Sequence, residues 1–222
     1  MMRLMVFGLK AGAFCLLMSV LFGFAGHLHP LFDSLSLLRL PLAAACLLVL
    51  VFPMGARLRF MLTAAVMLGA GTTVPMFFGA GSASDLRIYS KNMWFANKEL
   101  QALEQDIRNS GADVVALQEV SRANRALMVA LSDQYPHHPL CAFSGWSGIA
   151  VLSQEPLLQV RCSDRRALAA AQFDSKGGPV WVASVHLSWP FPYSNATSAR
   201  SAVDILNALD GPVVMAGDFN IF

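Results

Sequence analysis

The chain has 222 residues, of which 55% are hydrophobic and only 14% are charged, well below the roughly 25% charged residues of a typical soluble domain. This composition excludes intrinsic disorder, and the formal net charge of +2 excludes a strongly basic nucleic-acid-binding domain. Residues 1–84 contain five Lys/Arg and one acidic residue, whereas residues 85–222 contain eleven Lys/Arg and thirteen acidic residues. The excess of apolar residues is therefore N-terminal, and the C-terminal part has the composition of an ordinary, slightly acidic globular domain.

Three apolar stretches in the N-terminal part are each long enough to cross a membrane. They cover about residues 5–28, 35–52 and 60–81, and a helix of about 20 residues spans the hydrocarbon layer. Arg3 and Lys10 precede the first stretch, and Arg57 and Arg59 separate the second from the third. Because Lys and Arg are retained on the cytoplasmic side, this pattern places the N-terminus inside and everything after Gly81 outside. Alternatively, the first stretch is a cleaved signal peptide, which would leave two spans and the same exported part.

We therefore expect an integral protein of the inner or plasma membrane. Its predicted domains are a three-span anchor at residues 1–81, a linker at residues 82–84 and an extracytoplasmic domain, periplasmic or extracellular, at residues 85–222. Cys141 and Cys162 fall in this exported part. An oxidising compartment permits a disulfide between them, and the sequence leaves open whether the two thiols pair.

The C-terminal part predicts a mixture of strands and helices. Alternating or continuous apolar runs indicate strands, and an apolar face repeated every three to four residues indicates helices. Strands are expected at about residues 86–94, 113–117, 148–152, 157–162, 168–173, 180–187 and 212–217, and helices at about residues 98–110, 121–131 and 197–209. Strands outnumber helices and alternate with them only in part, which indicates an α/β sandwich or a mixed sheet with helices on its faces.

Polar side chains follow several of these predicted strands at the point where each strand ends. Asn92 ends the first strand, Glu119 follows the second, His186 ends the long strand, and Asp218 and Asn220 follow the last. Side chains at the same end of neighbouring strands converge on one pocket. Carboxylate and carboxamide oxygens together with an imidazole suit Mg²⁺ or Mn²⁺ and a phosphate group, rather than a tetrahedral thiolate site.

Four motifs in these regions resemble a known family. They are IYSKN at residues 88–92, VALQEV at 115–120, VHL at 185–187 and MAGDFN at 215–220. In order and spacing they are similar to the endonuclease/exonuclease/phosphatase superfamily, which has the pancreatic deoxyribonuclease-like fold. With its apolar N-terminal part, the chain resembles a membrane-anchored bacterial branch. The resemblance implies an α/β/β/α sandwich of four layers over about residues 85–222.

The resemblance also implies a role for each motif residue. Glu119 would ligate the divalent metal, Mg²⁺ or Mn²⁺, and Asn92 would support the metal or the phosphate. Asp218 and Asn220 would orient or deprotonate the attacking water and bind the phosphate. His186 would donate a hydrogen bond to a phosphate oxygen.

Structural interpretations remain open for these residues at this point. Asn92 could end a turn, Glu119 could begin the following helix, His186 could be a core histidine, and residues 218–220 could form an ordinary turn. Arg200 matches a basic position in the family's corresponding helix, and its sequence does not decide between facing a phosphate and making a surface ion pair.

The chain departs from the family pattern after Asn220. Family members continue through further strands to an Asp-containing motif and a final Asp-His pair, whose histidine is the acid/base partner. The expectation is therefore a C-terminally truncated, inactive fragment of a divalent-metal-dependent phosphodiesterase, phosphatase or nuclease. The alternative is a membrane-tethered, non-catalytic phosphate-binding module. Proximity to the membrane favours a lipid-linked phosphate as substrate, and nucleic acid is the other candidate.

Overall fold

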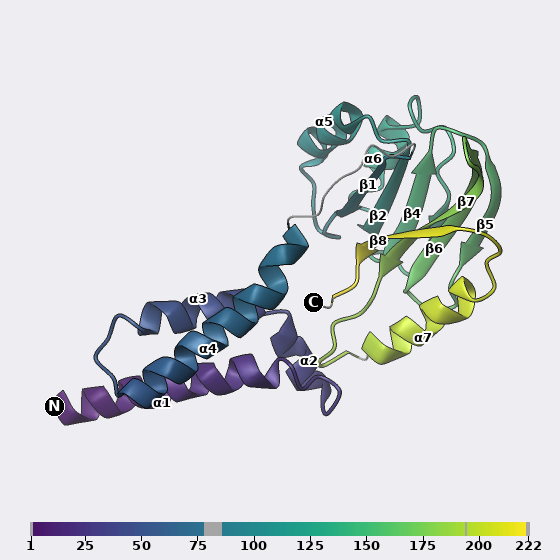
Figure 1. Ribbon diagram of the computed structural model, residues 1–222. Coiled ribbons are helices and arrows are strands. Elements are labelled where there is room, and N and C mark those ends of the chain that lie inside the picture. The colour runs from purple at the N-terminus through teal and green to yellow at the C-terminus, as the bar shows by residue number, and fades with distance from the viewer. Residues whose placement is uncertain (1, 78–85, 194, 221–222) are drawn as a thin grey trace. The chain divides into compact units, whose positions relative to one another are not determined.

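The computed structural model describes residues 2–77, 86–193 and 195–220. The chain divides into two compact units, which are treated separately (Figure 1). The first comprises Met1–Gly81, Trp189–Ser194 and Ile221–Phe222, and the second comprises Ser82–Ser188 and Asn195–Asn220. The predicted linker at residues 82–84 lies outside the described residues. The predicted domain boundaries therefore remain a prediction.

The first unit is a group of apolar helices. Its elements are α1 (Met2–Phe22), α2 (Pro30–Ser36), α3 (Arg39–Val49), α4 (Ala56–Thr73) and the short 3₁₀ helix η1 (Val74–Phe77). Helices α1, α3 and α4 pack around a common core that includes Leu17, Cys46 and Leu62. Large apolar side chains nevertheless remain exposed on the outside, such as Phe7 and Phe60, which are 72% and 75% exposed.

The three-span anchor is not confirmed by these helices. One described segment, Met5–Phe22, is long and apolar enough to cross a membrane, and a signal sequence near an N-terminus has the same properties. Helices α2 and α3 qualify only as one span that is bent by 69°. Helix α4 differs from the predicted third stretch because it begins at Ala56 and so includes Arg57 and Arg59 in its first turn. The described residues thus contain one candidate span, or two if the bent pair is counted.

The second unit contains two four-stranded sheets. Sheet A has the order β1 (Ile88–Asn92), β2 (Val114–Val120), β4 (Gly148–Ser153), β3 (Leu140–Cys141). Sheet B has the order β5 (Leu157–Cys162), β6 (Leu168–Ser175), β7 (Gly178–His186), β8 (Val213–Asp218). The mixed α/β class with two sheets agrees with the prediction, and β3 is a strand that the sequence pattern did not reveal.

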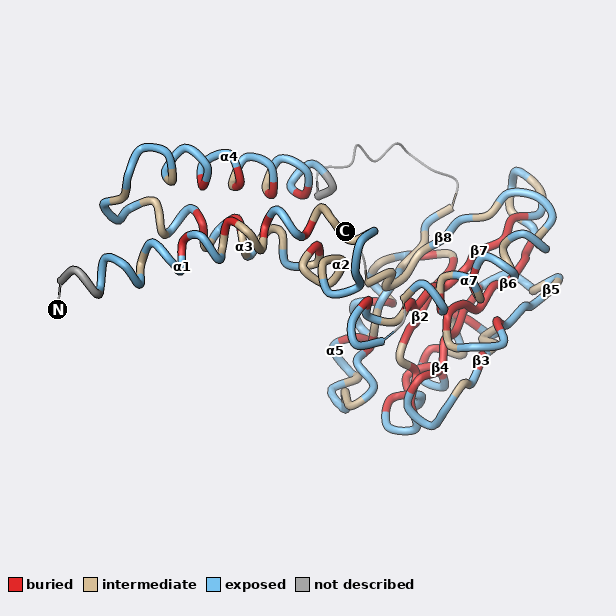
Figure 2. Tube along the Cα trace, turned by 90° about the horizontal axis from the view of Figure 1, so that it is seen from below, coloured by how far each residue is buried: buried red, intermediate tan, exposed pale blue. Residues whose placement is uncertain are grey.

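Helices cover both outer faces, so the second unit has four layers (Figure 1). Helices α5 (Leu100–Ser110) and α6 (Ala126–Ala130) pack on sheet A through Leu103, Ile107 and Leu127. Helix α7 (Asn195–Leu206) packs on sheet B through Ala202. A third cluster, which includes Ile149 and Val182, fills the space between the sheets. The inner strands β2, β4, β6 and β7 are buried over most of their length (Figure 2).

Two strand pairs are parallel, and each is connected by a helix. Strands β1 and β2 pair in parallel with Asn92 opposite Gln118, and the connection between them contains α5. Strands β7 and β8 pair in parallel with His186 opposite Asp218, and their connection contains α7. A parallel pair brings the carboxyl ends of both strands to the same edge of the sheet. The predicted convergence of the strand-ending residues follows from this topology.

A buried polar contact joins the two sheets near that edge. Gln118 of β2 is 1% exposed, and its Nε2 donates to Oγ of Ser184 on β7 at 2.9 Å. The Ser184 hydroxyl, itself fully buried, donates back to the carbonyl of Leu117 at 3.2 Å. An unpaired amide in this position would cost about 1–3 kcal/mol, so the contact favours one alignment of the sheets over others.

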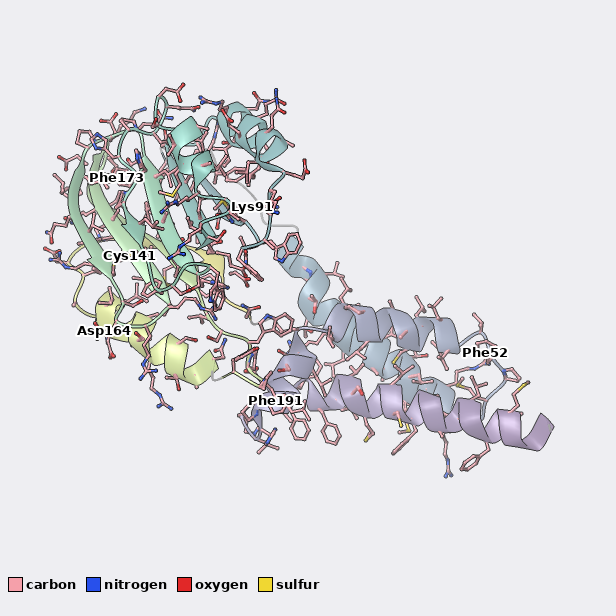
Figure 3. All side chains as sticks on the ribbon, turned by 180° about the vertical axis from the view of Figure 1, so that it is seen from behind. Phe52, Lys91, Cys141, Asp164, Phe173 and Phe191 are labelled. Carbon is pink, nitrogen blue, oxygen red and sulfur yellow. A yellow bond between two sulfur atoms is a disulfide. The ribbon has the colours of Figure 1, made fainter. Side chains whose placement is uncertain are left out.

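A disulfide joins the opposite edges of the two sheets. Cys141 on β3 and Cys162 at the end of β5 are bonded, with Cα atoms 5.7 Å apart. Cys141 lies in the same inter-sheet cluster as Phe173, and both residues are labelled in Figure 3. The pairing that the sequence left open is therefore present. The two cysteines are 21 residues apart in the sequence. A disulfide that closes a loop of this length stabilises a fold by about 3 kcal/mol, because it lowers the conformational entropy of the unfolded chain.

Replacement of both disulfide cysteines by serine is expected to lower the free energy of unfolding by about 3 kcal/mol. The measurement is urea denaturation of the detergent-solubilised chain, followed by tryptophan fluorescence, because Trp181 is buried in the core of the second unit. Cys15→Ser is the matched control, since Cys15 is a free, exposed thiol. Equal denaturation midpoints for the double variant and the control would contradict the structural role of the disulfide.

Candidate active site

The carboxamide of Asn92 connects two carboxylates that come from different sheets. Its Nδ2 donates to Glu119 Oε1 at 3.0 Å and to Asp218 Oδ2 at 2.9 Å. Asn92 and Glu119 lie at the ends of β1 and β2 in sheet A, whereas Asp218 ends β8 in sheet B. We call Asn92, Glu119, His186, Asp218 and Asn220 the strand-end cluster.

Backbone amides hold the first two members of this cluster in place. Phe95 N donates to Glu119 Oε2 at 2.9 Å, so both oxygens of this carboxylate are engaged. Trp94 N donates to Asn92 Oδ1 at 3.0 Å, which fixes the amide so that its N–H groups face the carboxylates. Asn92 therefore positions the acidic residues in this structure, and its predicted role as a metal or phosphate ligand remains a prediction.

Glu119 reaches this position through an irregularity in its strand. The pairing of β2 with β4 shifts register between Leu117 and Val120, and Glu119 itself has φ +56°. Bulges of this kind re-aim a side chain and are frequent near active sites. In the described part of the chain, the other non-glycine residues with positive φ are Trp94 and Asn220, which also belong to or adjoin the cluster. Backbone conformations of this kind concentrate at functional sites.

Asn124 fixes the chain that follows Glu119. It is fully buried, and its Oδ1 accepts from Ser121 N at 2.7 Å while its Nδ2 donates to the carbonyls of Glu119 and Trp94. Residues 121–125 therefore form a turn, and α6 begins only at Ala126. The predicted helix at residues 121–131 was too long, because these side-chain contacts replace the helical hydrogen bonds of its first turn.

His186 is almost completely buried beside Glu119. The residue is 4% exposed, and its Nε2 lies 3.6 Å from Glu119 Oε1, which is too long for a hydrogen bond. Burial lowers the pKa of His186, and the charge of Arg166 lowers it further, while Glu119 and Asp218 act in the opposite direction. The imidazole is therefore neutral at neutral pH. Its buried Nδ1 has no hydrogen-bond partner among the described residues.

The last strand brings Asp218 and Asn220 to the cluster through a close approach of two backbones. Gly217 has φ +148°, and a Cβ atom at this position would lie 2.0 Å from the carbonyl oxygen of Val185 on β7. Only glycine can occupy this position. Asn220 N then donates to Asp218 Oδ1 at 3.1 Å, and Asn220 Nδ2 donates to the carbonyl of Leu187 at 2.7 Å. Residues 218–220 therefore form a turn, and Asp218 and Asn220 of that turn also belong to the strand-end cluster.

Arg166 is the basic residue that lies beside the cluster, and sequence reasoning missed it. Its Cζ lies 5.0 Å from the centre of the Trp146 ring, and its Nη2 donates to Ser188 Oγ at 3.5 Å. The predicted basic residue, Arg200, is exposed on α7, and no hydrogen bond or ion pair joins it to the cluster within the described part of the chain. The sequence signal for Arg166 was the Arg165-Arg166 pair directly before the strand at Leu168.

The residues present suit a hard divalent cation. Glu119 and Asp218 accept hydrogen bonds from the same nitrogen, so their oxygens converge. The described residues contain no group of three His, Cys, Asp or Glu side chains arranged to hold a metal. Mg²⁺ differs from zinc in this respect, because it is commonly bound by one or two carboxylates and completes its shell with water and substrate phosphate. The donor set therefore fits Mg²⁺ or Mn²⁺ and does not fit a closed, all-protein site.

Comparison with known proteins identifies one matching family model. The model of the Endonuclease/Exonuclease/phosphatase family matches residues 89–222. No curated protein sequence matches the chain.

Several solved structures are similar to part of the chain. Truncated TDP2 from Caenorhabditis elegans has 17% identity and a TM-score of 0.49, with 62% of this chain and 63% of that chain covered. An AP endonuclease from Archaeoglobus fulgidus has 19% identity and a TM-score of 0.47, with coverages of 61% and 57%. ANGEL2, described as a 2′,3′-cyclic phosphatase, has 18% identity and a TM-score of 0.49, with coverages of 61% and 53%. The chain thus spans less than two thirds of the length of each of these three structures.

Replacement of Asn92 by alanine is expected to weaken Mn²⁺ binding about 10-fold to 100-fold, the usual effect of losing a residue that orients metal ligands. The two carboxylates would lose their shared donor, and each would have to be oriented without it. Mn²⁺ affinity of the solubilised chain is measured by electron paramagnetic resonance. Asn207→Ala, an exposed residue after α7, is the control, and equal affinities of the two variants would refute the positioning role.

Proposed function

Since the chain belongs to the Endonuclease/Exonuclease/phosphatase family, we propose that its strand-end cluster is the metal- and phosphate-binding part of a Mg²⁺-dependent phosphoester hydrolase. The observation that carries this proposal is the pair of carboxylates, Glu119 and Asp218, held on one amide beside a buried neutral histidine. Metal-dependent phosphoester hydrolysis uses these elements: oxygen ligands for a hard cation, a base for water and a donor for the phosphate.

Each residue has a distinct role in this proposal. Glu119 holds the cation, and Asn92 keeps the carboxylates of Glu119 and Asp218 in place. A bound Mg²⁺ supplies Lewis-acid stabilisation of the charge that develops on the phosphate. His186 donates a hydrogen bond from its imidazole N–H to a phosphate oxygen. Asp218 accepts the proton of the attacking water, and Asn220 orients the phosphate.

We propose further that these 222 residues bind metal and phosphate but do not turn over substrate by themselves. One feature supports this: the strand-end cluster contains a single histidine, His186, and the proposal above uses it to bind the phosphate. Metal-dependent phosphate binding without hydrolysis by the complete natural protein would instead identify a non-catalytic binding module.

In the complete natural protein, Asp218→Asn is expected to lower the hydrolysis of a chromogenic phosphodiester in the presence of Mg²⁺ about 10²- to 10⁴-fold, the range for loss of a general base. Asp204→Asn provides the control, because Asp204 is exposed on α7. The 222-residue chain is assayed in parallel. If the 222-residue chain hydrolyses the substrate and Asp218→Asn abolishes that activity, its proposed inactivity is wrong. If Asp218→Asn leaves hydrolysis by the complete natural protein unaltered, the proposed role of Asp218 is wrong.

The domain is proposed to face the extracytoplasmic side, anchored by the apolar helices, with a lipid-linked phosphate or nucleic acid as substrate. The basic flanks of the apolar stretches support this orientation. A membrane-proximal substrate is consistent with an anchor that ends only a few residues before the family match.

This orientation predicts that Lys176→Cys reacts with a membrane-impermeant maleimide in intact cells and that Arg57→Cys does not. Lys176 is in the turn between β6 and β7, and Arg57 is in the first turn of α4. Both variants are made in a background without Cys15 and Cys46, whereas Cys141 and Cys162 are already bonded to each other. The reverse labelling pattern would place the domain in the cytoplasm.

A further inference from the structure

A cavity outside the strand-end cluster has the features of a second anion site. Its volume is about 280 Å³, and it lies between the turn at residues 121–125 and the loop that connects β3 to β4. Arg122, Arg125 and Ser144 line it together with the apolar residues Val120, Leu140 and Phe143. None of its lining residues belongs to the cluster, and none is acidic.

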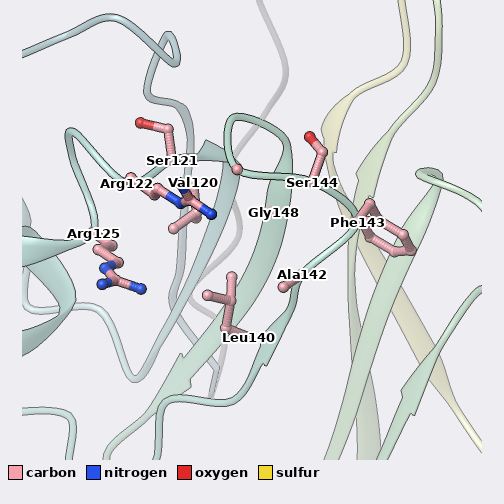
Figure 4. Close-up of a pocket in the computed structure, with 10 residues that line it drawn as sticks. Val120, Ser121, Arg122, Arg125, Leu140, Ala142, Phe143, Ser144 and Gly148 are labelled. Atoms are coloured by element: carbon pink, nitrogen blue, oxygen red, sulfur yellow. The ribbon is translucent and has the colours of Figure 1, made fainter.

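No acidic side chain in the described part of the chain pairs with the positive charge of Arg122 or Arg125. Arg122 and Arg125 are exposed, and neither guanidinium has a hydrogen bond, ion pair or ring contact within the described part of the chain. By contrast, Arg108 binds both Glu104 and Asp133. Figure 4 shows the two arginine side chains on the left and Ala142, Phe143 and Ser144 on the right, with Leu140 and Gly148 between them. A pair of free guanidinium forks is suited to a phosphate, because each can donate two parallel hydrogen bonds.

The backbone that carries the arginines is held rigidly. The buried side chain of Asn124 fixes the turn from inside, and the Ser121 hydroxyl accepts from the backbone N of Ala123 at 3.1 Å. Arg122 N donates to the carbonyl of Gly145 at 3.0 Å, which ties the turn to the opposite loop. The backbone from which the two arginines extend is therefore fixed, whereas their guanidinium groups become ordered only when a ligand binds.

The size and lining of the cavity indicate what the phosphate is attached to. A volume of about 280 Å³ corresponds to roughly nine water molecules, which exceeds the space needed for a phosphate group alone. Leu140, which is 37% exposed, also lines the cavity, and its apolar side chain would contact the carbon skeleton of the ligand. We propose that this cavity binds a phosphate group attached to a small organic group, at a site separate from the metal-binding cluster.

The test is the binding of inorganic phosphate to the full, detergent-solubilised chain in the presence of EDTA, measured by isothermal titration calorimetry. EDTA keeps the cluster free of metal, so the result does not depend on the proposed hydrolase function. Saturable binding is expected, and Arg122→Gln combined with Arg125→Gln should weaken it about tenfold or more, the effect of losing charged hydrogen bonds. Arg165→Gln, which removes the same charge from an exposed arginine outside the cavity, should leave the affinity unchanged.

Two results would overturn the proposal: absence of saturable binding by the unaltered chain, or equal affinity of the double variant and Arg165→Gln. Circular dichroism checks that the double variant is folded. The pair Arg122→Lys and Arg125→Lys, which keeps the charge and loses the planar forks, should retain part of the affinity.

The phosphate can come from the substrate itself or from a free metabolite, and kinetics of the complete natural protein separates the two. A KM that rises in the double variant only for substrates with a second phosphate assigns the site to the substrate. Unchanged KM values together with lost phosphate binding assign it to a free phosphorylated ligand.

Discussion

The carboxamide of Asn92 donates to Glu119 in one sheet and to Asp218 in the other, and the chemistry of the site depends on this double contact. Two carboxylates that approach each other repel, and the cost rises where water is partly excluded. The amide N–H groups compensate part of that repulsion, and a divalent cation would compensate the remainder. The contact can form only if the two sheets meet in one relative alignment, so the accuracy of the site is determined by the packing of the sandwich.

That alignment arises from features distributed over the second unit. Each sheet contributes one parallel pair, β1 with β2 and β7 with β8, and each pair ends at the edge where the cluster lies. The buried Gln118–Ser184 contact joins the sheets beside the cluster, whereas the disulfide between Cys141 and Cys162 joins them at their far edges. The apolar cluster between the sheets fills the space from one connection to the other. The sandwich is thus fixed at both edges of its inner interface.

The sequence predicted much of this site because its signals are local. A polar residue that ends an apolar strand is visible in sequence, and parallel pairing then brings Asn92, Glu119, His186 and Asp218 to one edge. Arg166 was missed because its position depends on the tertiary packing of a loop against Trp146. The helix at residues 121–131 was predicted too long because the apolar periodicity does not reveal that Asn124 hydrogen-bonds to the turn. The three spans were predicted from length and hydropathy, which do not report the 69° bend between α2 and α3.

The left-handed conformations of Trp94 and Glu119 set two opposing effects on stability at residue 119. A bulky or charged residue with positive φ costs about 1–3 kcal/mol relative to an unstrained backbone, and glycine at the same position avoids that cost. Glycine would, however, remove the oxygens that accept hydrogen bonds from Asn92 Nδ2 and Phe95 N. Both donors would then lose their acceptor, which opposes the gain from the relaxed backbone. The polar contacts of the cluster thus hold the backbone in a conformation that the glutamate alone disfavours.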